Sequence, residues 1–223
     1  MKFRFLFSLM VLLSVAIGLH AQNNGMGMGL RAGHNSTYGG FAAVSVETFL
    51  EMGNCFTMCG GVQYNSIGKT TLDVRPSCIV DLSWGKLSAD LLVTYMNLAS
   101  VNSFAAGAGA SVSAGRVGFK LGYYYRIFGG NGNMITEPFN TYYELCVRLL
   151  KKYVKWDLFL SITNNELFEL ERHFQPSFIA ECFYYPTQKI GVSFGLGCKP
   201  AGMFNMSADY YQSYLKTGLC YRW

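Results

Sequence analysis

Apolar and polar side chains alternate along most of this chain with a period of two residues. The alternation is strict over RVGFKLGYYYRIF (116–128) and over the closing YLKTGLCYRW (214–223). Successive side chains of a β-strand point to opposite faces of the sheet, so the pattern predicts strands with one apolar and one polar face. Weaker copies of the same alternation, separated by Gly, Asn and Pro turn signals, fill the other parts of the chain. We count about twelve strands long enough to cross a membrane, or ten if 41–66 or 166–185 is divided differently.

Alternation alone does not say which face points inward. A soluble lipocalin-like barrel buries its apolar face, whereas a membrane barrel turns that face toward lipid. Only 14% of the residues are charged, against about 25% in soluble domains, and 16% are aromatic. The polar face is rich in Gly, Ser, Thr and Asn, which suits a narrow lumen better than a water-facing surface. The sequence therefore predicts an all-β fold, a closed antiparallel up-and-down transmembrane β-barrel, with a soluble secreted lipocalin-like β-protein as the alternative.

The N-terminus predicts export. Lys2 and Arg4 precede an apolar run that extends to Leu19, and Ala21 supplies a small residue at the boundary. Positive residues, a short apolar run and a small residue at the boundary are together typical of a secretory signal peptide. The apolar run is also shorter than a membrane-spanning helix requires. We therefore expect a cleaved signal peptide at 1–21. A flexible Gly-rich lead-in or first short strand is expected at 22–40, and a single β-barrel domain at 41–223.

The last strand carries a resemblance to a known class of proteins. Leu219, Tyr221 and Trp223 end the chain as alternating large apolar residues. In this respect, and in the pattern of the whole chain after residue 21, the sequence resembles the small bacterial outer-membrane β-barrel proteins. The resemblance implies a location in the bacterial outer membrane, with outer-membrane lipid and the barrel-assembly machinery as partners and the final strand as the assembly signal. No Lys/Arg run is present, which argues against nucleic acid as a partner.

Charges of both signs fall on the predicted polar face. In a confined lumen such charges are expected to pair across strands. The sequence therefore predicts an integral outer-membrane barrel without catalysis, with a structural or interaction role or a narrow, weakly selective passive channel. The charges expected to face the lumen are Asp73, Arg75, Asp81, Lys86, Asp90, Arg116, Lys120, Arg126, Glu144, Arg148, Lys155, Asp157, Lys216 and Arg222.

One pair of residues offers a catalytic alternative. His34 and Ser36 are two residues apart, and outer-membrane lipid A deacylases resemble this, with Ser as the nucleophile and His as its base. No acid partner can be assigned to this pair. A lipid-modifying hydrolase is therefore kept only as the alternative to a non-catalytic barrel. The seven cysteines lack CxxC spacing, and no metal or cofactor is expected. They read as free thiols or as one or two cross-strand disulfides.

Deletion of Trp223 tests the assembly signal. We expect the deletion to reduce the fraction of protein that reaches the membrane in folded form, because the last strand loses its aromatic end. Membrane fractionation and heat-modifiable gel mobility measure this fraction. Normal assembly of the deletion would contradict a role for this residue in the signal.

Overall fold

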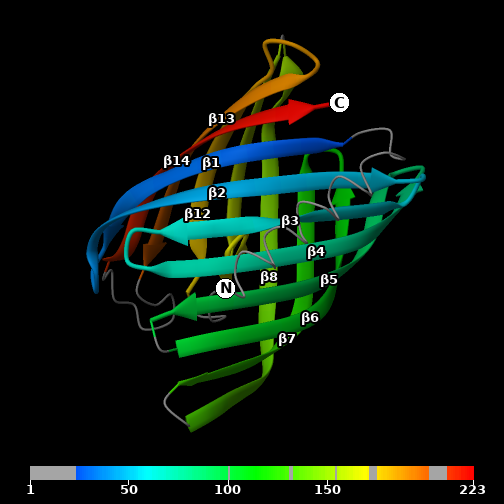
Figure 1. The fold of residues 1–223 in the computed structure, drawn as a ribbon. Helices are drawn as coiled ribbons and strands as arrows, with labels where there is room; N and C mark the ends of the chain where they lie inside the picture. Colours follow the sequence, from blue (N-terminus) through cyan, green and yellow to red (C-terminus); the bar gives the residue numbers. More distant parts are fainter. Residues whose placement is uncertain (1–23, 100, 131–132, 154, 171–174, 201–209) are drawn as a thin grey trace.

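Twelve antiparallel strands close into one barrel in which strands adjacent in the chain pair with each other (Figure 1). The computed structural model describes residues 24–99, 101–130, 133–153, 155–170, 175–200 and 210–223. The predicted fold and strand number are confirmed, and ten strands is excluded. The barrel strands are β1 (Gly25–Asn35), β2 (Gly39–Met52), β3 (Phe56–Asn65), β4 (Lys69–Leu82), β5 (Gly85–Leu98), β6 (Val101–Ala114), β7 (Val117–Gly130), β8 (Asn133–Tyr153), β9 (Trp156–Thr163), β12 (Ser177–Tyr184), β13 (Ile190–Pro200) and β14 (Tyr210–Arg222).

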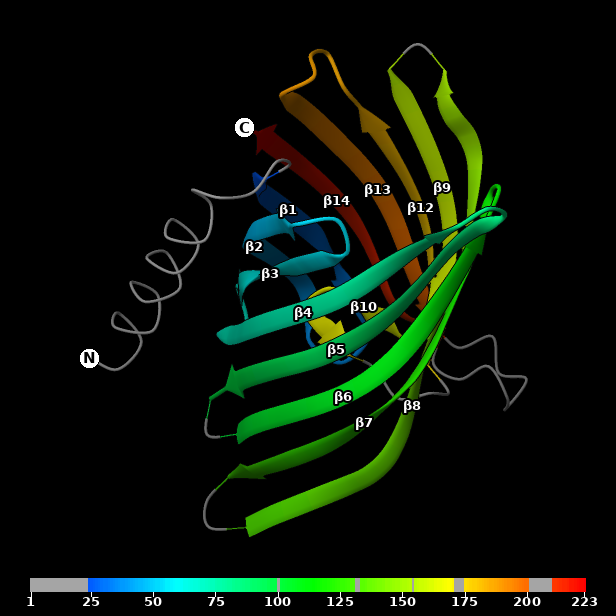
Figure 2. The ribbon, with the colours of Figure 1, turned by 90° about the vertical axis from the view of Figure 1, so that its right-hand side faces the viewer.

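Two further strands form a separate small sheet. β10 (Asn165–Glu166) and β11 (Glu169–Leu170) pair only with each other and lie within the ring of barrel strands (Figure 2). They belong to the connection between β9 and β12. This hairpin is the one ordered element of the described chain that leaves the barrel wall.

The N-terminal predictions fall partly outside the described chain. The signal peptide expected at 1–21 lies outside the described residues. The interval 22–40 contains β1 and the turn that follows it, and β2 begins at Gly39. Within the described residues, no helix has the length and apolar character needed to cross a membrane.

β1 and β14 close the barrel. They pair in unbroken register from Gly25↔Arg222 to Asn35↔Gln212, and β1 pairs with β2 along the same residues. Beyond the last strand, the Trp223 backbone N–H donates to the Asn24 carbonyl at 3.0 Å. An open edge in lipid would leave backbone donors and acceptors unpaired, so this register removes a large free-energy penalty.

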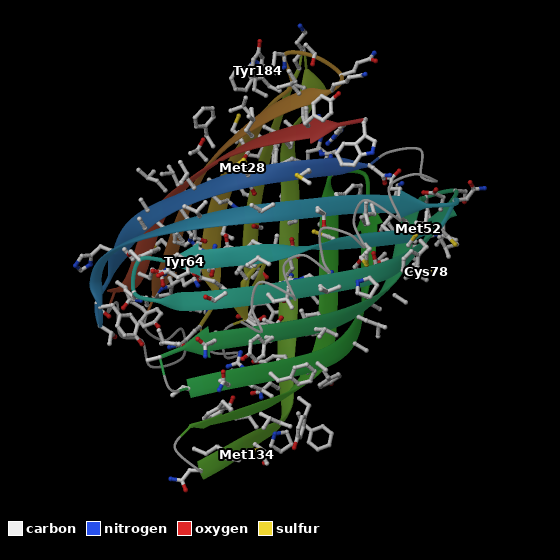
Figure 3. The ribbon with its side chains drawn as sticks, viewed as in Figure 1. Met28, Met52, Tyr64, Cys78, Met134 and Tyr184 are labelled. Atoms are coloured by element: carbon white, nitrogen blue, oxygen red, sulfur yellow. The ribbon has the colours of Figure 1, made fainter. Side chains whose placement is uncertain are left out.

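The apolar set of the alternation covers the outside of the barrel. Met28, Leu30, Leu215 and Leu219 are each 58–61% exposed, although large aliphatic side chains are normally buried. Figure 3 shows such side chains projecting outward from the ribbon, Met28 and Tyr64 among them. This orientation is opposite to that of a lipocalin-like barrel, and it excludes the soluble alternative on the described strands.

All three tryptophans of the chain lie at one rim. Trp84 is in the turn before β5, Trp156 begins β9 and Trp223 follows β14. All three lie at the mouth where the first and last described residues, Asn24 and Trp223, meet, which we call the mouth with the termini. Their exposures are 58%, 43% and 46%. Tryptophan is enriched where a membrane meets water, because its ring is amphipathic. The rim therefore has the composition of an interfacial aromatic girdle.

Glycines on the inner face make room for inward-pointing tyrosines. A Cβ at Gly197 would collide with the ring of Tyr214, and a Cβ at Gly122 would collide with the ring of Tyr142. Tyr142 and Tyr214 are 1% and 3% exposed. The small residues of the polar face therefore let large rings lie flat across neighbouring strands in a narrow lumen.

This packing predicts different effects for two Gly→Ala substitutions. Gly197→Ala should lower the free energy of unfolding by about 1–3 kcal/mol, because the added methyl overpacks the ring of Tyr214. Gly40→Ala is the matched control on β2, since nothing lies within 4 Å of a Cβ at that position. Urea unfolding followed by tryptophan fluorescence in lipid vesicles measures both variants. Equal stability of the two variants would contradict the packing role of Gly197.

Candidate functional site

The chain turns into the lumen at the end of β9. The Asn164 side chain accepts a hydrogen bond from the Tyr143 N–H at 2.8 Å and donates to the Thr141 carbonyl at 2.9 Å. The Asn164 side chain thus bonds β8 backbone groups that the backbone of a further β9 residue would otherwise bond. The Asn165 N–H then donates to the Thr163 hydroxyl at 2.9 Å. These short-range bonds end the β8–β9 ladder and direct the hairpin β10–β11 inward.

On one side, the hairpin rests on an ion pair from β4. Arg75 binds the two carboxylate oxygens of Asp73 at 2.9 and 2.8 Å, and Asp73 is fully buried. The same guanidinium donates to the carbonyls of Asn165 and Glu166 at 2.9 and 2.8 Å. The Asp73 carboxylate accepts the backbone N–H of Phe168 at 3.0 Å. The backbone polar groups of the hairpin are therefore satisfied by charged groups of the wall.

On the opposite side, Arg31 of β1 holds both hairpin carboxylates. Its guanidinium lies 3.0 Å from an oxygen of Glu166 and 3.0 Å from an oxygen of Glu169, and all three side chains are at most 10% exposed. The guanidinium also stacks on the Tyr214 ring at 3.4 Å from the centroid. The Tyr214 hydroxyl donates to Glu166 at 2.5 Å. A single arginine thus links the barrel wall to both strands of the hairpin.

Two lysines complete the network. Lys199 of β13 pairs with Glu169, and Lys216 of β14 lies 3.4 Å from Glu166 and 3.0 Å from Glu181. Burial alone would raise the pKa of Glu169, but Arg31 and Lys199 outweigh it and hold that pKa well below its usual range. The hairpin carboxylates are therefore ionised at neutral pH, and the ion pairs are maintained.

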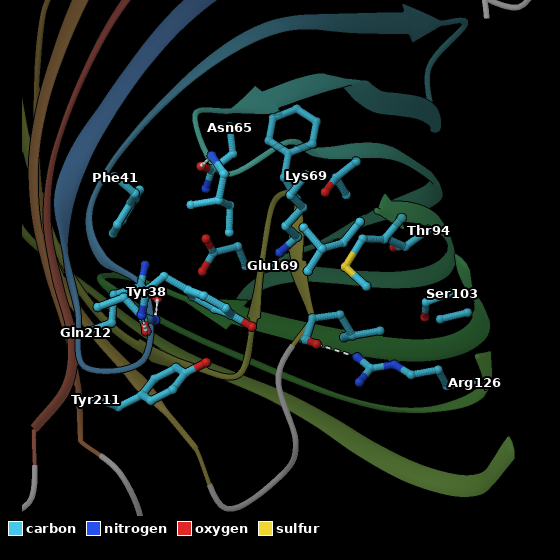
Figure 4. A pocket seen from close by; sticks show the side chains of 18 residues that line it. Tyr38, Phe41, Asn65, Lys69, Thr94, Ser103, Arg126, Glu169, Tyr211 and Gln212 are labelled. Atoms are coloured by element: carbon cyan, nitrogen blue, oxygen red, sulfur yellow. Dashed lines mark hydrogen bonds between the residues drawn. The ribbon is translucent and has the colours of Figure 1, made fainter. Parts of the chain in front are cut away.

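The hairpin lies between two polar cavities of the lumen. One cavity, of about 400 Å³, is lined by Arg31, Glu47 and Lys216 and extends toward the mouth with the termini. The other, of about 250 Å³, is lined by Lys69, Arg126 and residues of the opposite mouth (Figure 4). Phe168 borders both cavities. A solute that moves along the barrel axis would have to pass the hairpin.

The charges predicted to face the lumen divide into two groups. Lys120 lies 3.2 Å from Asp90, and longer contacts of 3.9 Å join Arg126 to Glu137 and Arg148 to Asp157. The buried or half-buried group is Asp73, Arg75, Asp90, Lys120, Arg126, Glu144, Arg148, Asp157 and Lys216. The exposed group, at the mouth that holds the termini, is Asp81, Lys86, Arg116, Lys155 and Arg222.

The remaining candidate residues lie away from the hairpin. His34 is exposed near the end of β1, and Ser36 is exposed in the turn that follows. Leu219, Tyr221 and Trp223 are exposed at the end of β14. All seven cysteines are free thiols, and the described residues contain no group of three His, Cys, Asp or Glu side chains able to hold a metal ion.

Sequence reasoning found Asp73, Arg75 and Lys216 of the network but missed Arg31, Glu166, Glu169 and Lys199. In the sequence, Glu169 reads as part of a polar strand end and Lys199 as part of a turn. Most connections between neighbouring barrel strands span two to five residues, whereas β9 and β12 are separated by 164–176. The length of this connection, together with its carboxylates in a chain poor in charge, is the signal that could have indicated an inserted element.

Comparison with known proteins supports the fold. No family model and no curated protein matches the sequence. Among solved structures, the KdgM porin in complex with disordered oligogalacturonate aligns with a TM-score of 0.58 at 8% identity, covering 88% of this chain and 98% of that one. The translocator domain of the autotransporter NalP from Neisseria meningitidis gives 0.58 at 12% identity, covering 97% and 95%, and the NanC porin gives 0.55 at 11%, covering 89% and 98%. The chain therefore has the fold of the outer-membrane β-barrel porins and translocators.

The ion pair beneath the hairpin predicts a large stability difference between two isosteric variants. Asp73→Asn should lower the free energy of unfolding by about 3 kcal/mol, because it leaves the Arg75 cation buried without its carboxylate. Asp81→Asn is the control, since Asp81 and Lys86 are 70% and 61% exposed and such a pair contributes less than about 1 kcal/mol. Denaturant unfolding of the folded protein in vesicles gives both values. A loss for Asp73→Asn no larger than that of the control would show that the pair does not support the hairpin.

Proposed function

We propose that this protein is a narrow outer-membrane channel whose passage is limited by the hairpin β10–β11. The observation that carries the proposal is the position of the hairpin between two polar cavities of one lumen. A barrel that served only to span the membrane would need no second cavity on the far side of an inserted element.

The location rests on the outer surface of the barrel. The exposed aliphatic belt and the tryptophan rim match a lipid-facing wall with an interfacial girdle. The solved porins of similar fold support the same location. We infer that the mouth with the termini faces the periplasm, because outer-membrane barrels place short turns there and longer connections outside. The hairpin β10–β11 then enters the lumen from the outer side.

The lumen chemistry favours small solutes and weak charge selectivity. Arg31, Arg75, Lys199 and Lys216 face Asp73, Glu166, Glu169 and Glu181, so the hairpin network contains equal numbers of cations and anions. A selective pore requires an excess of one sign at its constriction. The network therefore supports a size-limited passage rather than one filtered by charge at the hairpin itself.

Planar bilayer recordings test the channel and the role of the hairpin together. The wild-type protein should give small conductance steps. The double variant Glu166→Gln/Glu169→Gln should give steps that are several-fold larger or more frequent, because the hairpin loses its pairs with Arg31 and Lys199. Lys86→Gln is the control, since its exposed pair lies at the periplasmic mouth.

Folding of each variant is checked first by the heat-dependent shift in gel mobility that closed barrels show. Folded wild-type protein without conductance steps, together with a silent double variant, would leave a structural or interaction role. Identical steps in wild type and double variant would show that the hairpin does not limit the passage.

A further inference from the structure

The outer cavity contains a cation without an ion pair of its own. Lys69, the first residue of β4, lines the cavity and makes no ion pair within the part of the chain that the structure describes. Glu169 interacts electrostatically with Lys69, but its carboxylate is already paired with Arg31 and Lys199. Figure 4 shows Lys69 pointing into the cavity beside Glu169. The surplus positive charge attracts an anion into this part of the lumen.

Two buried hydroxyls face the same cavity without a hydrogen-bond partner. Thr71 and Thr94 are 1% and 7% exposed, and neither hydroxyl is bonded to another described group. Both line the cavity. A buried polar group without a partner is destabilising, and in native proteins such a group calls for an explanation. A bound ligand that accepts and donates hydrogen bonds would explain why both hydroxyls lack a partner within the protein.

The register brings these groups to one patch of the wall. Lys69 and Thr71 are two residues apart on β4, so their side chains share the inner face. Thr71 pairs with Met96, which places Thr94 on β5 as its diagonal neighbour, at roughly 7–8 Å between backbones. Thr94 pairs with Ala105, and Ala105 pairs with Arg126. Ala105, between Thr94 and Arg126, also lines the cavity.

Arg126 is a second cation with spare donors. One of its terminal nitrogens donates to the Leu170 carbonyl of the hairpin, and the other lies 3.9 Å from Glu137. A guanidinium has five N–H donors, so these contacts do not exhaust it. The hairpin thus fixes Arg126 at the edge of the cavity, as Figure 4 shows.

We propose that this cavity binds a small hydroxylated organic anion. Lys69 binds its anionic group, and the hydroxyls of Thr71 and Thr94 and the spare N–H donors of Arg126 bond its hydroxyl groups. At about 250 Å³ the cavity is smaller than the roughly 300–1,000 Å³ of drug-sized sites, which restricts the ligand to a compact molecule. The inference rests on the proposed channel function, because the anion would be a solute captured on the outer side of the hairpin.

Three probes of equal carbon-chain length separate the contributions of charge and hydroxyl groups. Gluconate carries both, sorbitol carries only hydroxyls, and hexanoate carries only the charge. Titration calorimetry on the folded full-length protein in detergent measures binding without requiring conductance. Gluconate should bind at least about tenfold more tightly than either of the other probes, since each lost contact reduces affinity several-fold.

Substitutions then assign the contacts. Lys69→Met should weaken gluconate binding by about tenfold, whereas Lys86→Met at the opposite mouth should leave it unchanged. The double variant Thr71→Val/Thr94→Val should weaken binding by roughly tenfold and yet leave unliganded stability equal or slightly higher, because unpaired hydroxyls are removed. Thr217→Val on the exposed outer face is the matched control.

Each outcome bears on the proposal. Equal binding of sorbitol and gluconate would remove the role of Lys69, and equal binding of hexanoate would remove that of the hydroxyls. Unchanged affinity in Lys69→Met, or absence of gluconate binding to the folded wild type, would overturn the site. Binding in a protein that gives no conductance steps would keep the site and reject only the channel function.

Discussion

Every strand of a membrane-spanning sheet needs a partner on both edges, and here the pairing of β1 with β14 supplies the last of them. The register runs without a shift along the whole of β1. Because closure is obligatory in lipid, the two faces of the sheet become an outside and an inside with opposite requirements. The alternation of apolar and polar residues along each strand meets both requirements, because it places apolar side chains outside and polar side chains inside.

The inside requirement is the harder one to meet. A twelve-stranded barrel encloses too little space for many large polar side chains, and each enclosed charge needs a partner. The protein meets this in two ways. Glycines give room to the rings of Tyr142 and Tyr214, and a hairpin from the β9–β12 connection supplies carboxylates that lumenal arginines and lysines would otherwise lack.

The fold was predictable because its signal is local and repeated. A period of two residues over many short segments predicts strands, and composition decides which face is outside. The hairpin was not predictable, since its partners are distant in sequence. Nothing near Glu166 or Glu169 indicates Arg31, and Asn164 reads equally well as an ordinary turn. Pairing of lumenal charges across strands was expected from the pattern, and Lys120 with Asp90 is one such pair, whereas the particular partners depend on the closed barrel and on which carboxylates the hairpin brings.

The way in which the hairpin is anchored has a consequence for the order of folding. Arg31 and Glu166 are separated by 135 residues, and Tyr214 and Glu166 by 48, so the anchors come from the first and last strands. Those strands become neighbours only when the sheet closes. The lumenal network must therefore be completed after closure, and contacts of such high sequence separation form slowly. The contacts of the hairpin with the first and last strands are then the last to form, and an incompletely closed barrel would hold its hairpin without them, through contacts such as those of the ion pair of β4.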